Sequence, residues 1–198
     1  MRASLRKILL LTLAPGAAIA QNSDLSLLFG PSHGMVRNSP NAQVSEDIGF
    51  ANQYAFAWQV LDAKAGGLYV EIPFHFAGYS SANTRDGVAR GGTNSYLFTP
   101  GLRFRFSLRS RLSFYLAGGG GVGVFGVKYI YYAGPNSGTI SENHTASGLV
   151  DFGGGIDYRL TRLLSLRGEG RDFVSRRVLG PGSSRNLVVV GAGIGLHF

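Results

Sequence analysis

Cysteine is absent from this chain of 198 residues, and charged residues make up only 15% of it. The lack of cysteine excludes a disulfide framework, a thiolate metal site, a cysteine nucleophile and a lipid anchor on cysteine. No run of apolar residues reaches the roughly 18 that a membrane-spanning helix needs. Disordered chains have few aromatic residues and many charges, whereas aromatic residues make up 12% of this sequence. At about 150 residues per domain, the composition indicates one folded domain.

The first twenty residues have the three parts of a secretory signal peptide. Basic residues lie within the first seven positions, an apolar core follows at residues 8–13, and residues 18–20 have the small-x-small cleavage pattern. The apolar core is too short to cross a membrane. We therefore expect residues 1–20 to be a signal peptide and residues 21–198 to be the exported domain.

Large apolar residues occupy nearly every second position over long stretches, with small or polar residues between them. In residues 48–60 the pattern is interrupted only at Asn52. A period of two is typical of a β-strand whose two faces meet different surroundings. Similar stretches cover residues 25–29, 68–76, 96–106, 112–124, 150–160, 164–171 and 188–198. We count eight candidate strands and no candidate helix.

The connections between the candidate strands alternate between short and long. Short ones cover residues 62–67, 107–111 and 161–163, and long polar ones cover residues 31–47, 80–94, 126–145 and 176–185. Outer-membrane barrels have tight periplasmic turns and longer extracellular loops. Strands cross lipid only as a closed ring, because lipid offers no partners to backbone polar groups. The sequence therefore predicts an all-β fold, an eight-stranded antiparallel up-and-down transmembrane β-barrel.

The two faces of the predicted strands carry different residues. One phase holds bulky side chains such as Phe56, Phe104 and Ile194, and the other holds glycine, alanine and charged residues such as Arg105 and Asp157. In a transmembrane barrel the bulky phase faces lipid, whereas in a soluble lipocalin-like carrier it fills the interior. The alternating connections favour the membrane arrangement, and the soluble carrier is the alternative.

Charged residues fall in the predicted inward phase. An eight-stranded barrel is just wide enough for its own side chains to fill the interior, and buried charges persist when they are paired. If Leu160 lies opposite Leu164, Asp157 lies directly across from Arg167. We predict an ion-pair network in the lumen that comprises Glu71, Arg103, Arg105, Asp151, Asp157, Arg159, Arg167, Glu169 and Arg171. The network either neutralises a closed lumen or gates a narrow path through it.

The end of the chain carries a further pattern. In residues 190–198 apolar side chains alternate with small ones up to a final phenylalanine, and residues 115–123 are rich in glycine. With the signal peptide and the eight strands, these features resemble the small outer-membrane barrels of the OmpA/OmpX and opacity-type families. The resemblance implies a location in the outer membrane of a Gram-negative bacterium. The sequence departs from part of the family because it stops at the last predicted strand, so we expect no periplasmic domain. It also implies that Ile194, Leu196 and Phe198 form the signal that the outer-membrane assembly machinery recognises.

Two prolines fall inside predicted strands. Pro73 and Pro100 lie on neighbouring strands at similar heights, and each removes a hydrogen bond from a strand ladder. We therefore expect a local irregularity there, for which a shared bulge is one explanation.

Basic residues exceed acidic ones in the predicted outer loops. They are Arg37, Arg85, Arg90, Lys128, Arg176, Arg177 and Arg185. Guanidinium groups bind phosphate through two hydrogen bonds, so we expect lipopolysaccharide as a partner besides membrane lipid; a solvated rim is the alternative. The loops also offer a surface to an external partner. Because the basic residues are dispersed rather than gathered in a stripe, we expect no nucleic-acid partner.

Residues that could carry catalysis are few. The glycines of residues 119–126 and 191–195 lack the following helix and the lysine of a nucleotide-binding loop. Some related barrels act on lipid A with a serine, a histidine and an acid, and the candidates here are His33, His75, His144 and His197 with Ser32, Ser141 and Ser147. No His-x-Ser pair occurs among them, so we expect no enzyme, cofactor or metal. We interpret the chain as a structural or surface-interaction protein, with a passive, porin-like conduit for small solutes as the alternative.

Overall fold

The structure, a computed structural model, describes residues 22–37, 46–63, 66–79, 83–85, 88–108, 111–134, 137–176 and 184–198. The expected signal peptide, residues 1–20, lies outside the described residues. Within the described ranges, no helix is long and apolar enough to cross a bilayer.

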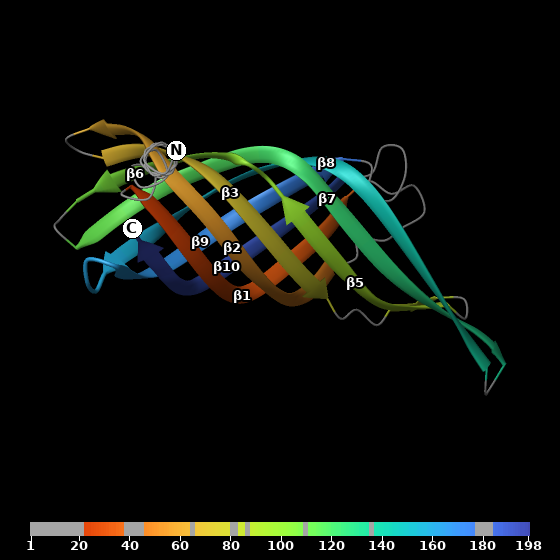
Figure 1. The fold of residues 1–198 in the computed structure, drawn as a ribbon. Helices are drawn as coiled ribbons and strands as arrows, with labels where there is room; N and C mark the ends of the chain where they lie inside the picture. Colours follow the sequence, from red (N-terminus) through yellow and green to blue (C-terminus); the bar gives the residue numbers. More distant parts are fainter. Residues whose placement is uncertain are drawn as a thin grey trace, which may run out of the picture.

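The described chain folds into ten strands that form one closed barrel (Figure 1). The strands are β1 (Ser23–Arg37), β2 (Glu46–Ala63), β3 (Gly66–Tyr79), β4 (Asn83–Arg85), β5 (Val88–Phe98), β6 (Gly101–Ser107), β7 (Leu112–Gly134), β8 (Ser137–Arg159), β9 (Leu164–Arg176) and β10 (Ser184–His197). All pairings are antiparallel, and β1 pairs with β10 to close the ring. Because β5 and β6 both lie between β3 and β7, they form one wall strand, and the short β4 pairs with β5 alone. The wall therefore has eight strands, which confirms the predicted fold class.

The barrel has a turn end and a hairpin end. At the turn end the connections are short and the two ends of the described chain meet, where the Phe198 amide donates to the Ser23 carbonyl at 2.9 Å (Figure 1). At the hairpin end, β7 and β8 run for 23 residues each and stay paired as far as Gly134 and Ser137. The long loops expected at residues 80–94 and 126–145 are therefore largely strand, because continued pairing satisfies the backbone hydrogen-bonding groups.

Two prolines interrupt one ladder of the wall. Pro100 lies in the gap between β5 and β6, and Pro73 lies on β3 beside that gap. The pairs that flank the gap, Phe74–Phe98 and Glu71–Gly101, keep the same register. The prolines thus remove ladder hydrogen bonds at one height without the register shift of a bulge.

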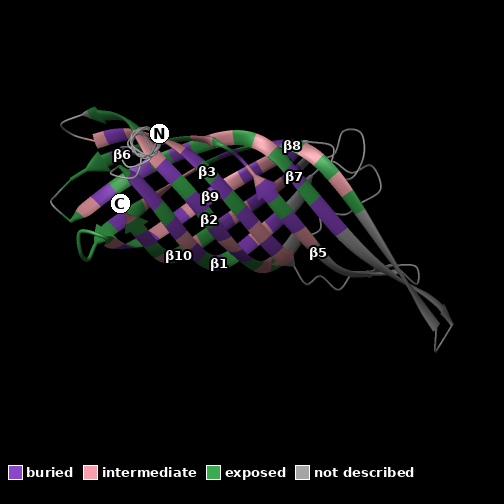
Figure 2. Ribbon diagram, in the orientation of Figure 1, coloured by how far each residue is buried: buried purple, intermediate pink, exposed green. Residues whose placement is uncertain are grey.

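The two faces of the wall separate as the alternation predicted. Buried and exposed positions alternate along each strand (Figure 2). Phe56, Phe104 and Ile194 are 38%, 42% and 42% exposed, whereas Arg105 and Asp157 are buried. Bulky apolar side chains therefore cover the outside, and the charged ones lie inside. This orientation is the reverse of that in a soluble carrier with an apolar interior.

The lumen is filled in two layers. Nearer the hairpin end lies a set of buried apolar side chains that we name the apolar plug: Ala51, Ala77, Leu97, Phe125, Leu149, Phe173, Leu187 and Val189. Nearer the turn end, β1, β3, β6, β8 and β9 carry charged side chains inward. On β9, for example, Phe173 follows Arg167, Glu169 and Arg171 along the strand. Because these apolar side chains are buried against one another, the plug lies between the charged layer and the hairpin end.

Candidate functional site in the barrel lumen

Arg103 of β6 bridges its neighbour β3 and the more distant β1 through its guanidinium. Its Nη2 donates to Glu71 Oε1 on β3 at 2.5 Å, and its Nε donates to Glu71 Oε2 at 3.3 Å. Its Nη1 donates to Asp24 Oδ1 on β1 at 3.0 Å. The side chains of all three residues are almost fully buried. Charge-assisted hydrogen bonds of this kind are about twice as strong as neutral ones.

Arg167 of β9 makes the second set of contacts. The backbones of Arg167 and Asp157 are paired across β8 and β9, and Nε and Nη2 of the arginine donate to the two carboxylate oxygens at 2.7 and 2.9 Å. Nη2 also donates to Asp24 Oδ2 at 3.2 Å. Arg105 lies 3.4 Å from Asp157, and its Nε donates to Ser113 Oγ at 3.1 Å. Asp24 and Asp157 are thus each shared by two arginines.

Arg171 of β9 contacts three carboxylates. Its Nη2 donates to Glu71 Oε2 at 2.8 Å, its Nη1 donates to Asp151 Oδ2 at 2.7 Å, and its Nε donates to Glu169. Glu169 also accepts a hydrogen bond from the Tyr115 hydroxyl at 2.5 Å. Because Glu71 contacts both Arg103 and Arg171, these contacts connect all the groups into one network.

The network is almost balanced in charge. Four arginines face five carboxylates, which are Asp24, Glu71, Asp151, Asp157 and Glu169. The ring of Tyr115 lies between two of the cations, with its centroid 4.9 Å from Arg103 Cζ and 5.3 Å from Arg167 Cζ. Removing one partner of a buried ion pair leaves an uncompensated charge, and that costs about 3–5 kcal/mol. The arrangement therefore ties strands together across the lumen.

Sequence reasoning placed most of these groups and misplaced one. Eight of the nine residues expected in the lumen are buried, and Arg159 is exposed. Arg159 is the last residue of β8 and lies at the turn end, where the wall opens to solvent. Asp24 was not predicted as a member of the network. It lies in the inward phase of β1, whereas Leu25 and Leu27 lie in the outward phase. The run of alternating apolar residues near the start of β1 is short, so the inward position of the Asp24 carboxylate could not be recognised from it.

Arg185 also lies elsewhere than expected. The sequence assigned it to the cationic outer loops, but it is buried in β10 with its Cζ 5.6 Å from the Phe125 ring centroid. The strand begins at Ser184, so Arg185 falls in the inward phase of the wall rather than in a loop.

His197 of β10 contacts a serine that is not among the catalytic candidates of the sequence. His197 Nε2 lies 2.9 Å from Ser165 Oγ. Ser165 is fully buried, so its hydroxyl has no access to a substrate. His75 is buried against Phe173 with ring centroids 4.6 Å apart, while the side chain of Ser141 lies outside the described residues. Neither Ser165 nor His75 is exposed to a substrate.

Solved structures with similar folds are outer-membrane proteins. The attachment invasion locus protein Ail of Yersinia pestis is 12% identical, with a TM-score of 0.50 and coverage of 88% of this chain and 99% of that one. Neisserial surface protein A is 13% identical, with a TM-score of 0.52 and coverage of 88% and 97%. The outer-membrane protease OmpT of Escherichia coli is 10% identical, with a TM-score of 0.57 and coverage of 90% and 97%.

No protein-family profile matches the chain, and no curated protein matches it.

The similar solved structures show that the protein has the fold of the small outer-membrane barrels, as the sequence resemblance implied. One of the similar structures is a protease, whereas another is named as a surface protein. The shared fold thus leaves the activity open, because function depends on the site rather than on the fold.

Proposed function

We propose that the protein is an integral barrel of the outer membrane of a Gram-negative bacterium, with a structural or surface-interaction role and no catalytic activity. The observation that carries this proposal is the combination of an apolar outer face and a filled lumen. Leu116, Val150 and Phe152, for example, are more than half exposed on the outside. Water would penalise such a belt, whereas acyl chains stabilise it.

The filled lumen favours a structural role over a conduit. A solute that entered from the turn end would first meet the paired arginines and carboxylates, and then the apolar plug. Passage would require breaking buried ion pairs and displacing Leu97 and Phe125 from the plug, whose exposed fractions are 0% and 3%. Barrels of about eight strands have interiors that side chains fill, in contrast to the wider porins.

The paired β7 and β8 strands support a role at the cell surface. Each has 23 residues, whereas about ten residues suffice for a strand to cross the bilayer. The surplus forms a hairpin that projects past the rest of the barrel (Figure 1). With short turns in the periplasm, this hairpin would stand outside the cell. Phosphate groups of lipopolysaccharide and an external partner are the ligands we propose for this end.

Four measurements test the proposal. Expressed in a Gram-negative host, the protein is expected in the outer-membrane fraction, with a mobility on detergent gels that changes on heating. Protease added to intact cells is expected to cut near residues 134–137 and leave the barrel protected. In planar bilayers, the refolded barrel is expected to give no conductance steps. Regular steps in the wild-type protein would favour the conduit, and a soluble periplasmic protein would contradict the location.

A further inference from the structure

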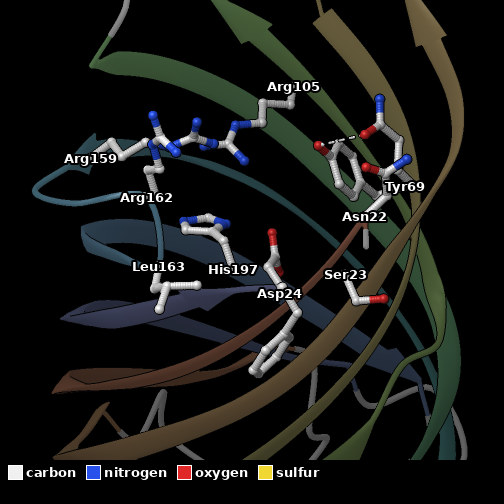
Figure 3. A pocket seen from close by; sticks show the side chains of 11 residues that line it. Asn22, Ser23, Asp24, Tyr69, Arg105, Arg159, Arg162, Leu163 and His197 are labelled. Carbon is white, nitrogen blue, oxygen red and sulfur yellow. Dashed lines mark hydrogen bonds between the residues drawn. The ribbon is translucent and has the colours of Figure 1, made fainter. Parts of the chain in front are cut away.

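A polar pocket opens at the turn end, at the edge of the ion-pair network. Its volume is about 310 Å³, and its lining includes Asp24, Arg105, Arg159, Arg162 and His197 (Figure 3). These residues come from β1, β6, β8, the β8–β9 turn and β10, so the pocket lies inside the ring of the wall strands. On another side, the Tyr69 hydroxyl donates to Gln59 Oε1 at 3.3 Å.

Three arginines line this pocket with few carboxylates to neutralise them. The side chains of Arg159 and Arg162 make no hydrogen bond or ion pair with any residue that the structure describes. The guanidinium groups of Arg105 and Arg159 point toward each other (Figure 3). Arg105 makes one ion pair among the described residues, at 3.4 Å to Asp157, whose oxygens already accept two shorter hydrogen bonds from Arg167. Like charges held together repel, and a bound anion would relieve that repulsion.

The acidic group in the pocket is already engaged. Asp24 accepts hydrogen bonds from Arg103 at 3.0 Å and from Arg167 at 3.2 Å. His197 is held by its contact with Ser165 at 2.9 Å. Neither group therefore compensates the charges of Arg159 and Arg162.

We propose that this turn-end pocket binds a small anion that carries a phosphate group, with Arg105, Arg159 and Arg162 as its ligands. Guanidinium groups present paired donors that match phosphate oxygens. The volume lies at the lower end of the range of about 300–1,000 Å³ for small-molecule sites, which suits inorganic phosphate or a small phosphate monoester. The site is independent of any ligand of the hairpin end, because the two lie at opposite ends of the barrel.

The phosphate group could belong to a free anion or to the headgroup of a phospholipid beside the barrel. Both sources present the same chemistry to the arginines. A free anion reaches the pocket along the barrel axis, whereas a headgroup must bend over the rim of turns. The two sources are therefore separable by comparing the protein in phosphate-free detergent with the protein in phospholipid bilayers.

Titration of inorganic phosphate into the refolded full-length barrel tests the proposal. The barrel is held in maltoside micelles at low ionic strength, and heat released on binding is measured. Arg159→Gln and Arg162→Gln are each expected to weaken binding roughly tenfold, which is the effect of losing one charge-assisted contact. Arg111→Gln is the matched control, since Arg111 is exposed in the adjacent turn and does not line the pocket. Arg159 and Arg162 are exposed as well, so their variants are expected to fold.

The same titration in phospholipid bilayers then distinguishes a free anion from a lipid headgroup as the source of the phosphate group. Phosphate affinity that is unchanged in bilayers of phosphatidylglycerol supports a free anion as the ligand. Affinity that is lost there and present in micelles supports a lipid headgroup in the same site. The proposal is overturned if the wild-type barrel binds no phosphate in micelles, or if both pocket variants bind it as well as the wild type and the Arg111 variant do.

Discussion

Asp24 and Arg103 are separated by 79 residues, yet the two oxygens of the carboxylate accept hydrogen bonds from Arg103 Nη1 at 3.0 and 3.1 Å. The same carboxylate accepts a hydrogen bond from Arg167 at 3.2 Å. One short side chain near the start of the wall thus holds two cations from β6 and β9. Its loss would leave both arginines partly uncompensated in a buried layer.

Asp24→Ala is therefore expected to destabilise the barrel by about 3–5 kcal/mol, the cost of breaking a buried ion pair. The measurement is urea unfolding of the refolded protein in micelles. Asp62→Ala is the control, because Asp62 is exposed and accepts one hydrogen bond from Gln59 at 3.1 Å. The exposed interaction contributes at most about 1 kcal/mol. Equal losses in the two variants would contradict the role given to Asp24.

Gly155 makes room for the Tyr115 ring. A Cβ added at Gly155 would collide with the Gly168 carbonyl oxygen and lie 2.5 Å from Tyr115 Cζ, too close for an ordinary contact. Gly155→Ala is expected to destabilise the barrel by about 1–3 kcal/mol through overpacking. A Cβ added at Gly170 meets nothing within 4 Å, so Gly170→Ala is expected to be neutral or slightly stabilising. Urea unfolding of both variants checks this contrast, and a harmless Gly155→Ala would show that the ring can move aside.

Arg167→Ala separates a filled lumen from a gated one. The variant breaks the contacts with Asp157 and Asp24, but it leaves the apolar plug intact. We expect it to lower stability without opening a path, so its conductance in planar bilayers stays at the wild-type baseline. Discrete conductance steps that appear only in this variant would instead favour ion pairs acting as a gate.

Phe198 is expected to act in assembly rather than in the stability of the finished barrel. Its side chain is 53% exposed, and Ile194 and Leu196 of the same terminal pattern are also exposed. Phe198→Ala is expected to lower the amount of assembled barrel in cells several-fold, while refolding into micelles stays efficient. Phe152→Ala is the control, with a side chain that is 57% exposed on the outside of β8. A similar loss of assembly in both variants would remove the special role of the terminal residue.

The alternation of bulky apolar residues with small or polar ones predicted the features that depend on a single strand or a single turn. The period of two assigned Phe104 to the outside and Arg105 to the inside, and the short turn after β8 put Asp157 beside Arg167. It did not reveal Asp24 as a partner of Arg103, because that contact crosses the lumen between strands far apart in the sequence. Alternation fixes the face of a strand, but not the side chain opposite it.

Two other features of the structure could not be predicted from the sequence, for related reasons. Inward Leu97 and Phe173 have no local mark that separates a plug residue from a lipid-facing one, since both positions are apolar. The extension of β7 and β8 past the membrane depends on backbone pairing, which continues where the apolar alternation ends. Backbone pairing beyond the apolar alternation is only weakly reflected in the order of polar and apolar side chains.

The central claim is that the bulky apolar phase faces lipid. The absence of cysteine allows single cysteines to carry spin labels at Leu102, Phe104 and Leu116 in bilayers, with Arg162 as the aqueous control. The account predicts collisions with dissolved oxygen and protection from a water-soluble nickel complex at the first three positions, and the reverse at Arg162. Labels at Leu102, Phe104 and Leu116 that collide freely with the nickel complex would contradict it.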